Sequence, residues 1–159
     1  MMDAEHLRDA LIYAAVSSDD PNTKVGAVLV AGSRRVYGCN LIPNKIDYVG
    51  LLRAGETKHT FTEHAERVAI YRAAAAGVPT AGAKLYAPWF ACPDCARAII
   101  LAGISEVIGL ASLDAQTPER WRRQIDVALA MLRQAGVATR WLSDRVGAEI
   151  LFDGRRVAC

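Results

Sequence analysis

Two short stretches decide the fold of this chain: His64-Ala65-Glu66 and Cys92-Pro93-Asp94-Cys95. Imidazole and thiolate groups are common zinc ligands, and one histidine with two cysteines leaves the fourth tetrahedral position of the metal open. An open position is typical of catalytic zinc sites, because water can occupy it. We therefore predict that His64, Cys92 and Cys95 bind one catalytic Zn²⁺ ion and that the Glu66 carboxylate remains free to move protons.

The spacing within each stretch supports this prediction. Helical residues three apart share a face, so Cys92 and Cys95 point the same way if a helix starts there, with Pro93 in its first turn. The partial positive charge of a helix N-terminus also favours thiolates over thiols. His64 and Glu66 are two residues apart, about 200° around a helix. We therefore expect Glu66 to meet the water at the open position rather than the zinc.

Helical and strand-like segments alternate on both sides of these stretches. Apolar periodicity and breaker residues predict helices over 2–17, 66–76, 92–102 and 118–136. Short β-branched or apolar runs predict strands over 25–30, 36–39, 84–87, 106–110 and 137–142, with a further hairpin over 149–157. The first two strands should pair as an antiparallel hairpin. The order predicts a single α/β domain over residues 1–159, with a mixed sheet of about five strands and helices on both faces.

Composition excludes several classes of protein. The formal net charge is +2 without a Lys-rich tail, which favours a small nucleotide or nucleobase over a nucleic acid as partner. The start of the chain lacks a basic apolar leader, and no apolar run is long enough to cross a bilayer. We therefore expect a cytoplasmic protein with no membrane partner. Cys39 and Cys159 are isolated, and we interpret them as small buried thiols.

Four stretches carry a resemblance to one known family, in chain order: Thr23–Val28, Gly38–Pro43, Glu63–Ile70 and Leu85–Ile104. They resemble the early strand, the asparagine loop and the two zinc helices of the deoxycytidylate (dCMP) deaminase branch of the cytidine deaminase superfamily. The pairing of an H-x-E stretch with a C-x-x-C stretch is the signature of zinc nucleobase deaminases. The resemblance implies a three-layer α/β/α fold of the cytidine deaminase type and a homo-oligomer, either a dimer or a hexamer.

The resemblance also implies a reaction. His64, Cys92 and Cys95 would hold the zinc, which makes hydroxide available to attack C4 of cytosine. Glu66 would take the water proton and deliver it to N3 and then to the leaving ammonia, as a general acid and base. The implied activity is that of a zinc-dependent hydrolase acting on a cyclic amidine, which converts dCMP to dUMP in pyrimidine nucleotide metabolism.

Substrate contacts follow from the same resemblance. Asn40 corresponds to a loop asparagine that hydrogen-bonds the sugar, and the backbone at Ala65 and Phe90 would contact the pyrimidine edge. Ala91 stands where the family usually has proline, which removes no zinc ligand. Leu41 stands where the family has glycine, and a leucine adopts positive φ only at a cost. We therefore expect the sugar loop to differ in shape.

Substrate identity should depend on the stretch between Asn44 and Phe61, which links a strand end to the first zinc helix. It offers cations or hydrogen-bond donors for a phosphate at four positions: Lys45, Arg53, Lys58 and His59. Because surface charges are often only solvated, none of these residues is assigned to the site.

Three functional interpretations remain open. The chain is a dCMP deaminase, a zinc deaminase of another free base or nucleoside such as cytosine, cytidine or guanine, or a zinc-binding protein without catalysis. A redox Cys-x-x-Cys pair leaves His64 and Glu66 without a role, and a structural zinc site would normally have a fourth Cys or His ligand. A monophosphate requirement separates the first interpretation from the second. Loss of activity in Glu66→Gln with zinc retained separates both from the third.

Overall fold

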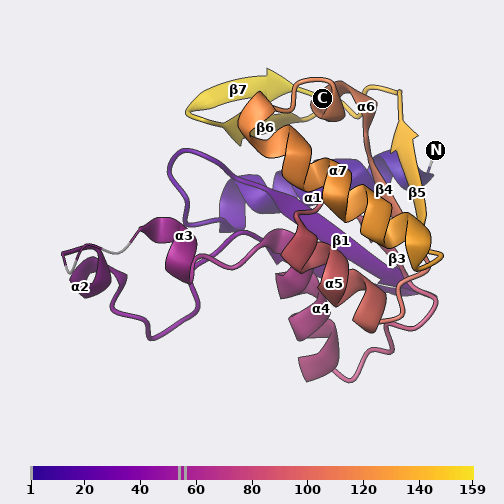
Figure 1. Ribbon diagram of the computed structural model, residues 1–159, viewed down its shortest axis with the longest axis horizontal. Coiled ribbons are helices and arrows are strands. Elements are labelled where there is room, and N and C mark those ends of the chain that lie inside the picture. The colour runs from indigo at the N-terminus through magenta and orange to yellow at the C-terminus, as the bar shows by residue number, and fades with distance from the viewer. Residues whose placement is uncertain (1, 54, 56) are drawn as a thin grey trace.

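The computed structural model describes residues 2–53, 55 and 57–159, and its centre is a five-stranded sheet in the order β2-β1-β3-β4-β5. The strands are β1 (Gly26–Ala31), β2 (Arg34–Cys39), β3 (Lys84–Tyr86), β4 (Glu106–Leu110) and β5 (Ala138–Leu142). β1 is antiparallel to both β2 and β3, whereas β3, β4 and β5 are parallel. The predicted hairpin and the predicted mixed sheet are therefore confirmed (Figure 1).

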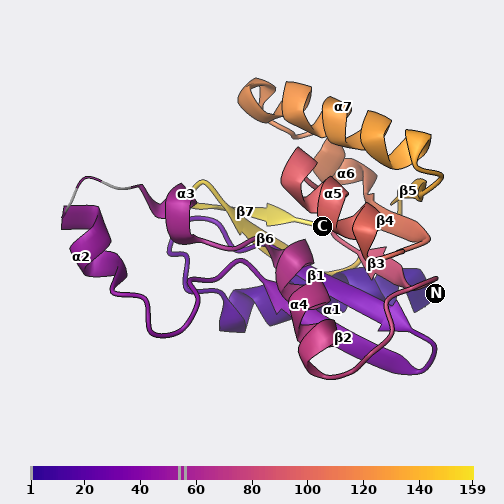
Figure 2. The same ribbon diagram turned by 60° about the horizontal axis from the view of Figure 1, so that its bottom comes forward.

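Helices cover both faces of this sheet, as predicted. The long helices are α1 (Met2–Ser17), α4 (Ala65–Ala75), α5 (Pro93–Leu101) and α7 (Glu119–Gln134). α1 packs on β1 and β2 from one face, and α4 packs on the same two strands from the other. α5 lies between α4 and α7 and contacts both (Figure 2). None of the helices formed by the described residues combines the length and hydropathy needed to span a bilayer.

Two glycines allow α1 and α4 to approach the sheet closely. A Cβ atom on Gly26 would lie 1.9 Å from the carbonyl oxygen of Ala10 in α1. A Cβ atom on Gly38 would lie 2.1 Å from the carbonyl oxygen of Ala65 in α4. Gly26 pairs with the residue after Gly38, so the two glycines face opposite sides of the sheet. Glycine at these positions brings each helix backbone against a strand backbone.

The core fills the space between the sheet and its helices. The largest fully buried side chains are branched aliphatic residues contributed by both helices and strands: Leu7, Leu11, Val28, Leu29, Leu85, Ile99, Ile104, Ile108, Leu110, Leu113, Leu132 and Ile150. Burial of such side chains contributes about 1.5–3 kcal/mol each before entropy costs are counted. The layer of α4, α5 and α7 is therefore held rigidly against the strands that end at the site.

A second, two-stranded sheet is formed by β6 (Glu149–Phe152) and β7 (Arg155–Ala158), as the C-terminal hairpin prediction anticipated. Its turn is fastened to the segment before β1, because the Lys24 amide donates to the Leu151 carbonyl at 2.9 Å and the Gly154 amide donates to the Asn22 carbonyl at 2.8 Å. The hairpin is thereby held next to the carboxyl end of β2 and the amino end of β1.

The stretch between Asn44 and Phe61 differs from the simple link that the sequence indicated. It contains the short helices α2 (Tyr48–Arg53) and α3 (Lys58–Phe61), and it extends away from the sheet in both ribbon views (Figures 1 and 2). Two of its residues, Ala54 and Glu56, lie outside the described part of the chain. A third short helix, α6 (Ala111–Asp114), follows β4. Helices of four to six residues are too short to give a periodic signal.

Candidate active site

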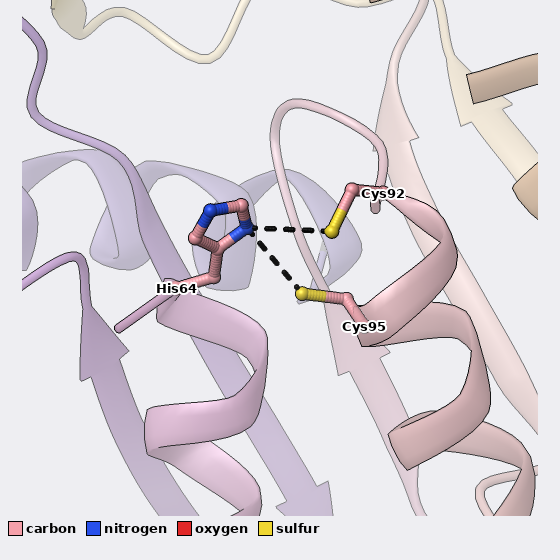
Figure 3. A group of neighbouring side chains, drawn as sticks. All are labelled: His64, Cys92 and Cys95. Carbon is pink, nitrogen blue, oxygen red and sulfur yellow. Dashed lines mark hydrogen bonds between the residues drawn. The ribbon is translucent and has the colours of Figure 1, made fainter. Parts of the chain in front are cut away.

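The ends of two neighbouring helices bring the predicted metal ligands together. His64 is the N-cap residue of α4, and Cys92 is the N-cap residue of α5, with Pro93 as the first helical residue. Nδ1 of His64 lies 3.5 Å from Sγ of Cys92 and 3.6 Å from Sγ of Cys95. Figure 3 shows the imidazole pointing at both sulfur atoms across the gap between the helices. The three residues form a group that could hold one metal ion.

The dimensions of this group match zinc. Zinc–sulfur bonds of about 2.3 Å and zinc–nitrogen bonds of about 2.05 Å at a tetrahedral angle place nitrogen and sulfur about 3.5 Å apart. The two distances from His64 Nδ1 are 3.5 and 3.6 Å. One nitrogen and two sulfur donors also suit zinc, and three protein ligands leave one position for water. The residues present therefore fit a catalytic zinc ion.

The pKa shifts within this group differ among its three residues. A hydrogen bond from Cys95 lowers the pKa of Cys92 to about 3. The same hydrogen bond and burial raise the pKa of the Cys95 thiol. A hydrogen bond with Cys92 raises the pKa of His64. The N-termini of α4 and α5 add partial positive charge from two helix dipoles. Zinc binding requires thiolates and a neutral imidazole, so any proton that Cys95 or His64 carries is released when the metal binds.

Glu66 lies beside this group and is not one of its three members. It is the second residue of α4, it is only 4% exposed, and its Oε2 lies 3.6 Å from Sγ of Cys95. Burial raises the pKa of the Glu66 carboxyl. A carboxyl group held at this position can accept and return protons within reach of the predicted zinc, which is the arrangement that general acid–base chemistry requires.

A cavity of about 310 Å³ opens in front of the metal group. Its volume lies at the lower end of the range for small-molecule sites. His64, Glu66 and Cys92 line its inner part, and the remainder of its wall comes from the loops at the sheet edge, from α3, from the start of α7 and from the tip of the β6–β7 hairpin. The residues from those outer elements include Asp20, Thr23, Lys58, His59, Arg120, Trp121, Gln124, Phe152 and Asp153.

Asn40 lines the cavity, but most of its hydrogen-bonding capacity is used within the protein. Its Oδ1 accepts hydrogen bonds from Ser18 Oγ at 2.7 Å and from the Val25 amide at 2.9 Å. Its Nδ2 donates to the Thr23 carbonyl at 2.7 Å. An amide nitrogen carries two hydrogens, so one remains for a ligand. The predicted sugar contact is therefore limited to a single donated hydrogen bond.

The other two predicted substrate residues also line the cavity. Ala65 is the first residue of α4, where a backbone N–H has no partner inside the helix. Phe90 packs in the core against Trp141, with ring centroids 4.5 Å apart, and still contributes to the wall. Trp89 also lines the cavity, and its ring centroid lies 4.2 Å from that of Phe152. These aromatic residues thus serve both the core and the pocket.

The loop that carries Asn40 shows how leucine replaces the family's glycine. Leu41 is not among the described residues with positive φ, and it forms an antiparallel bridge with Glu63. The Leu41 amide donates to the Glu63 carbonyl at 3.1 Å, and the Glu63 amide donates to the Leu41 carbonyl at 2.8 Å. An extended Leu41 therefore needs no left-handed conformation, and the bridge ties this loop to the residue that precedes His64.

Sequence reasoning located only part of the outer wall. Of the four candidate cations, Lys58 and His59 line the cavity beside the metal group, whereas Lys45 and Arg53 do not. Arg120 and Asp153 also line it, and neither was predicted. Pro118 did mark the start of the helix that carries Arg120. The sequence contains no signal that the start of this helix lines the same cavity as the metal group, because this placement depends on packing between elements far apart in the chain.

Comparisons with known proteins fit this geometry. An uncharacterized deaminase in the luxG 3' region of Aliivibrio fischeri is 36% identical over 129 residues, which cover 79% of this chain and 83% of that protein. The deoxycytidylate deaminase of Homo sapiens is 35% identical over 112 residues, which cover 65% of this chain and 62% of that protein. The crystal structure of dCMP deaminase from the cyanophage S-TIM5 in complex with dCMP and dUMP has the same fold. It gives a TM-score of 0.71 at 24% identity, covering 89% of this chain and 96% of that chain.

The family match covers the part of the chain that builds the metal group. Residues 1–111 match the family described as the cytidine and deoxycytidylate deaminase zinc-binding region. This range includes the four stretches that carry the resemblance, and it ends before α7 and the β6–β7 hairpin. The chain belongs to the cytidine and deoxycytidylate deaminase family.

Proposed function

We propose that this protein is a zinc-dependent hydrolytic deaminase that converts dCMP to dUMP and releases ammonia. The observation that carries the proposal is the spacing of His64, Cys92 and Cys95, at 3.5 and 3.6 Å from nitrogen to sulfur, with the buried Glu66 carboxyl next to them in one cavity. Membership of the deaminase family supports the reaction. The relatives named as dCMP deaminases support the choice of substrate.

The chemistry replaces the amino group at C4 of cytosine with oxygen from water. A zinc ion held by His64, Cys92 and Cys95 would supply hydroxide near neutral pH by lowering the pKa of water. Glu66 takes up one proton from the water and delivers it to N3 as the C4–O bond forms, and then transfers the remaining hydroxyl proton to the amino group as the C4–N bond breaks. Water and dCMP are consumed, and dUMP and ammonia are formed.

Residues around the cavity orient the nucleotide for this step. The free Nδ2 hydrogen of Asn40 donates to a sugar oxygen, and the backbone at Ala65 and Phe90 contacts the pyrimidine edge. Because Asn40 is fixed by three hydrogen bonds, it is already in position before substrate binds. The aromatic faces of Trp89 and Phe90 exclude water from the ring.

The test is ammonia release from zinc-loaded protein, measured in parallel on dCMP, CMP, deoxycytidine, cytidine, cytosine and guanine. We expect turnover of dCMP, and we expect Glu66→Gln to reduce kcat by roughly 10²- to 10⁴-fold, because a positioned acid and base contributes about that much. Zinc content of the variant should equal that of the unaltered protein, since Glu66 is not in the metal group.

The same assay separates the alternatives. Preference for a free base or nucleoside would reject dCMP as the substrate and keep the deaminase chemistry. Full activity of Glu66→Gln would reject the role given to Glu66. If protein that holds one zinc ion releases ammonia from none of the six compounds, the result would favour a zinc-binding protein without this catalysis.

A further inference from the structure

Two ion pairs lie at the outer wall of the cavity, and they differ in how much of each pair is exposed to solvent. Lys58 Nζ lies 2.7 Å from Asp20 Oδ2, and the Asp20 side chain is 8% exposed. Arg120 is paired with Asp153, and both of these side chains are more than half exposed. All four residues line the cavity that contains the metal group. The first pair is therefore part of the scaffold, whereas the second faces solvent.

The Lys58–Asp20 pair has a structural task. Oδ1 of Asp20 accepts hydrogen bonds from the amides of Asn22 at 2.9 Å and Thr23 at 3.0 Å, while Oδ2 receives Lys58. Asp20 thus shapes the turn before β1 and fastens α3 to it. A buried carboxylate that satisfies three donors holds its lysine strongly, because releasing the lysine leaves a charge unpaired.

The Arg120–Asp153 pair is easier to exchange. Exposed ion pairs contribute only about 0–1 kcal/mol, so a phosphate can replace Asp153 as the partner of Arg120 at little cost. A guanidinium binds phosphate through two parallel hydrogen bonds. Arg120 also sits in the first turn of α7, where the helix dipole adds partial positive charge.

Asp153 is held at a fixed position that keeps the guanidinium over the cavity. It occupies the β6–β7 turn with φ of 47°, followed by Gly154 with φ of 74°. The Asp153 amide donates to Thr23 Oγ1 at 3.2 Å. The guanidinium of Arg120 also lies 5.9 Å from the ring centroid of Trp121. These contacts limit the orientations that the arginine can adopt before a ligand binds.

We propose that Arg120 is a specificity-determining residue that receives the monophosphate of the nucleotide, with Asp153 holding its guanidinium in place until the phosphate arrives. The inference rests on the proposed deaminase function and adds to it the residue that selects a phosphorylated substrate. Arg120 lies beyond residue 111, where the family match ends. Selection for phosphate therefore comes from a part of the chain that the shared zinc-binding region does not include.

The test compares Arg120→Gln with Arg123→Gln, a matched control on the same helix that is exposed and does not line the cavity. We expect Arg120→Gln to lower kcat/KM for dCMP roughly 10- to 100-fold, mainly through KM, as expected for loss of a charge-assisted hydrogen bond. Turnover of deoxycytidine should stay within about twofold, because this nucleoside has no phosphate. Arg123→Gln should match the unaltered protein on both compounds.

A second variant separates phosphate binding from a structural role of the ion pair. Asp153→Asn breaks the same pair and keeps the guanidinium, and asparagine tolerates the positive φ of the turn. We expect it to retain preference for dCMP over deoxycytidine within about threefold, since an exposed pair contributes little. If Arg120→Gln keeps this preference, whether or not Lys58→Gln loses it, the assignment of Arg120 is wrong.

A binding measurement keeps this inference distinct from the proposed reaction. Titration calorimetry of dUMP and deoxyuridine into zinc-loaded Glu66→Gln protein requires no turnover. We expect dUMP to bind more tightly than deoxyuridine, and the addition of Arg120→Gln to remove that difference. Equal affinities for dUMP and deoxyuridine with Arg120 present would overturn the inference, even if the protein deaminates deoxycytidine. An inactive protein that still prefers dUMP would reject the reaction and support the Arg120 site.

Discussion

The inner and outer halves of the cavity are built in different ways. The inner half, with His64, Glu66 and Cys92, comes from two helix N-termini packed on the sheet, and its side chains are buried or half-buried. The outer half comes from α3, the first turn of α7 and the tip of the β6–β7 hairpin, and it includes the exposed Arg120–Asp153 pair. The reaction requires reacting groups at fixed positions. Selection of the substrate can instead depend on exposed side chains that exchange one ionic partner for another.

The two halves also differ in what they share with other proteins. The inner half lies within residues 1–111, the range of the family match, as does α3 of the outer half, while α7 and the hairpin lie beyond it. A common zinc chemistry can therefore be combined with a different outer wall. If this division is right, a change that displaces the metal ligands of the inner half should weaken zinc binding, and damage to the outer half should leave zinc in place.

The largest effect should come from Gly38→Ala, which acts on the inner half. The new Cβ would lie 2.1 Å from the Ala65 carbonyl oxygen and 2.6 Å from the Ala69 amide nitrogen, so α4 must move away from β2. We expect the free energy of unfolding to fall by about 3 kcal/mol. Zinc affinity should fall as well, because α4 carries His64 at its start. Urea unfolding and zinc competition with a chromophoric chelator measure the two effects.

Gly26→Ala is the matched control for that change. Its Cβ would lie 1.9 Å from the Ala10 carbonyl oxygen, so the strain falls on α1 at the opposite face of the sheet. A similar loss of stability with zinc affinity unchanged in the folded protein is expected. Equal loss of zinc affinity in both variants would show that the metal group responds to general destabilisation rather than to the position of α4.

A smaller effect should follow from Phe152→Ala in the outer half. The Phe152 ring lies 4.2 Å from that of Trp89 and lines the cavity. We expect about 1–2 kcal/mol less stability in urea, since the variant loses a stacked aromatic pair and part of the buried apolar area. Zinc content should stay the same, and KM for dCMP should rise. Phe152→Leu, which keeps apolar bulk, should recover part of the stability. Zinc loss in Phe152→Ala would contradict the division between the two halves.

The same division explains how far the sequence alone could go. The long helices and the five-stranded sheet were predicted correctly, because their apolar periodicity and their breaker residues lie within each segment. Each part of the metal group has a local signature, in the spacing of Cys92 and Cys95 and of His64 and Glu66, and the resemblance to zinc deaminases joined the two parts. The structure brings His64, Cys92 and Cys95 together.

The outer half could not be predicted in this way. Arg120 and Asp153 are 33 residues apart and come from different elements. An exposed arginine has no local signature that separates a ligand-binding cation from a solvated one. The short helices α2 and α3 were also missed, since neither is long enough to show a repeat.

The predicted homo-oligomer, a dimer or a hexamer, stays a prediction that requires a measurement of mass in solution.

The smallest predicted effect concerns α1, which contributes to neither half and so provides a reference for both. His6 is 5% exposed, its ring centroid lies 4.7 Å from that of Tyr86, and its Nδ1 has no hydrogen-bond partner among the described residues. Burial, followed by the nearby Arg35, lowers its pKa from the ordinary value of 6.5, against the opposing influence of three carboxylates: Asp3, Glu5 and Asp9.

Because the pKa of His6 is lower in the folded state than in the unfolded state, the unfolded state binds more protons as the pH falls through about 6.5, and stability decreases. One proton limits this slope to about 1.4 kcal/mol per pH unit. His6→Phe keeps an aromatic ring against Tyr86 but cannot titrate, so its unfolding free energy should fall less steeply between about pH 7.5 and 5.5 in urea titrations of zinc-loaded protein. Identical slopes for the two proteins would mean that the pKa of His6 is the same in the folded and unfolded states. A change in zinc content with this variant would instead show that α1 supports the inner half across the sheet, and the comparison drawn from Gly26 and Gly38 would then have to be abandoned.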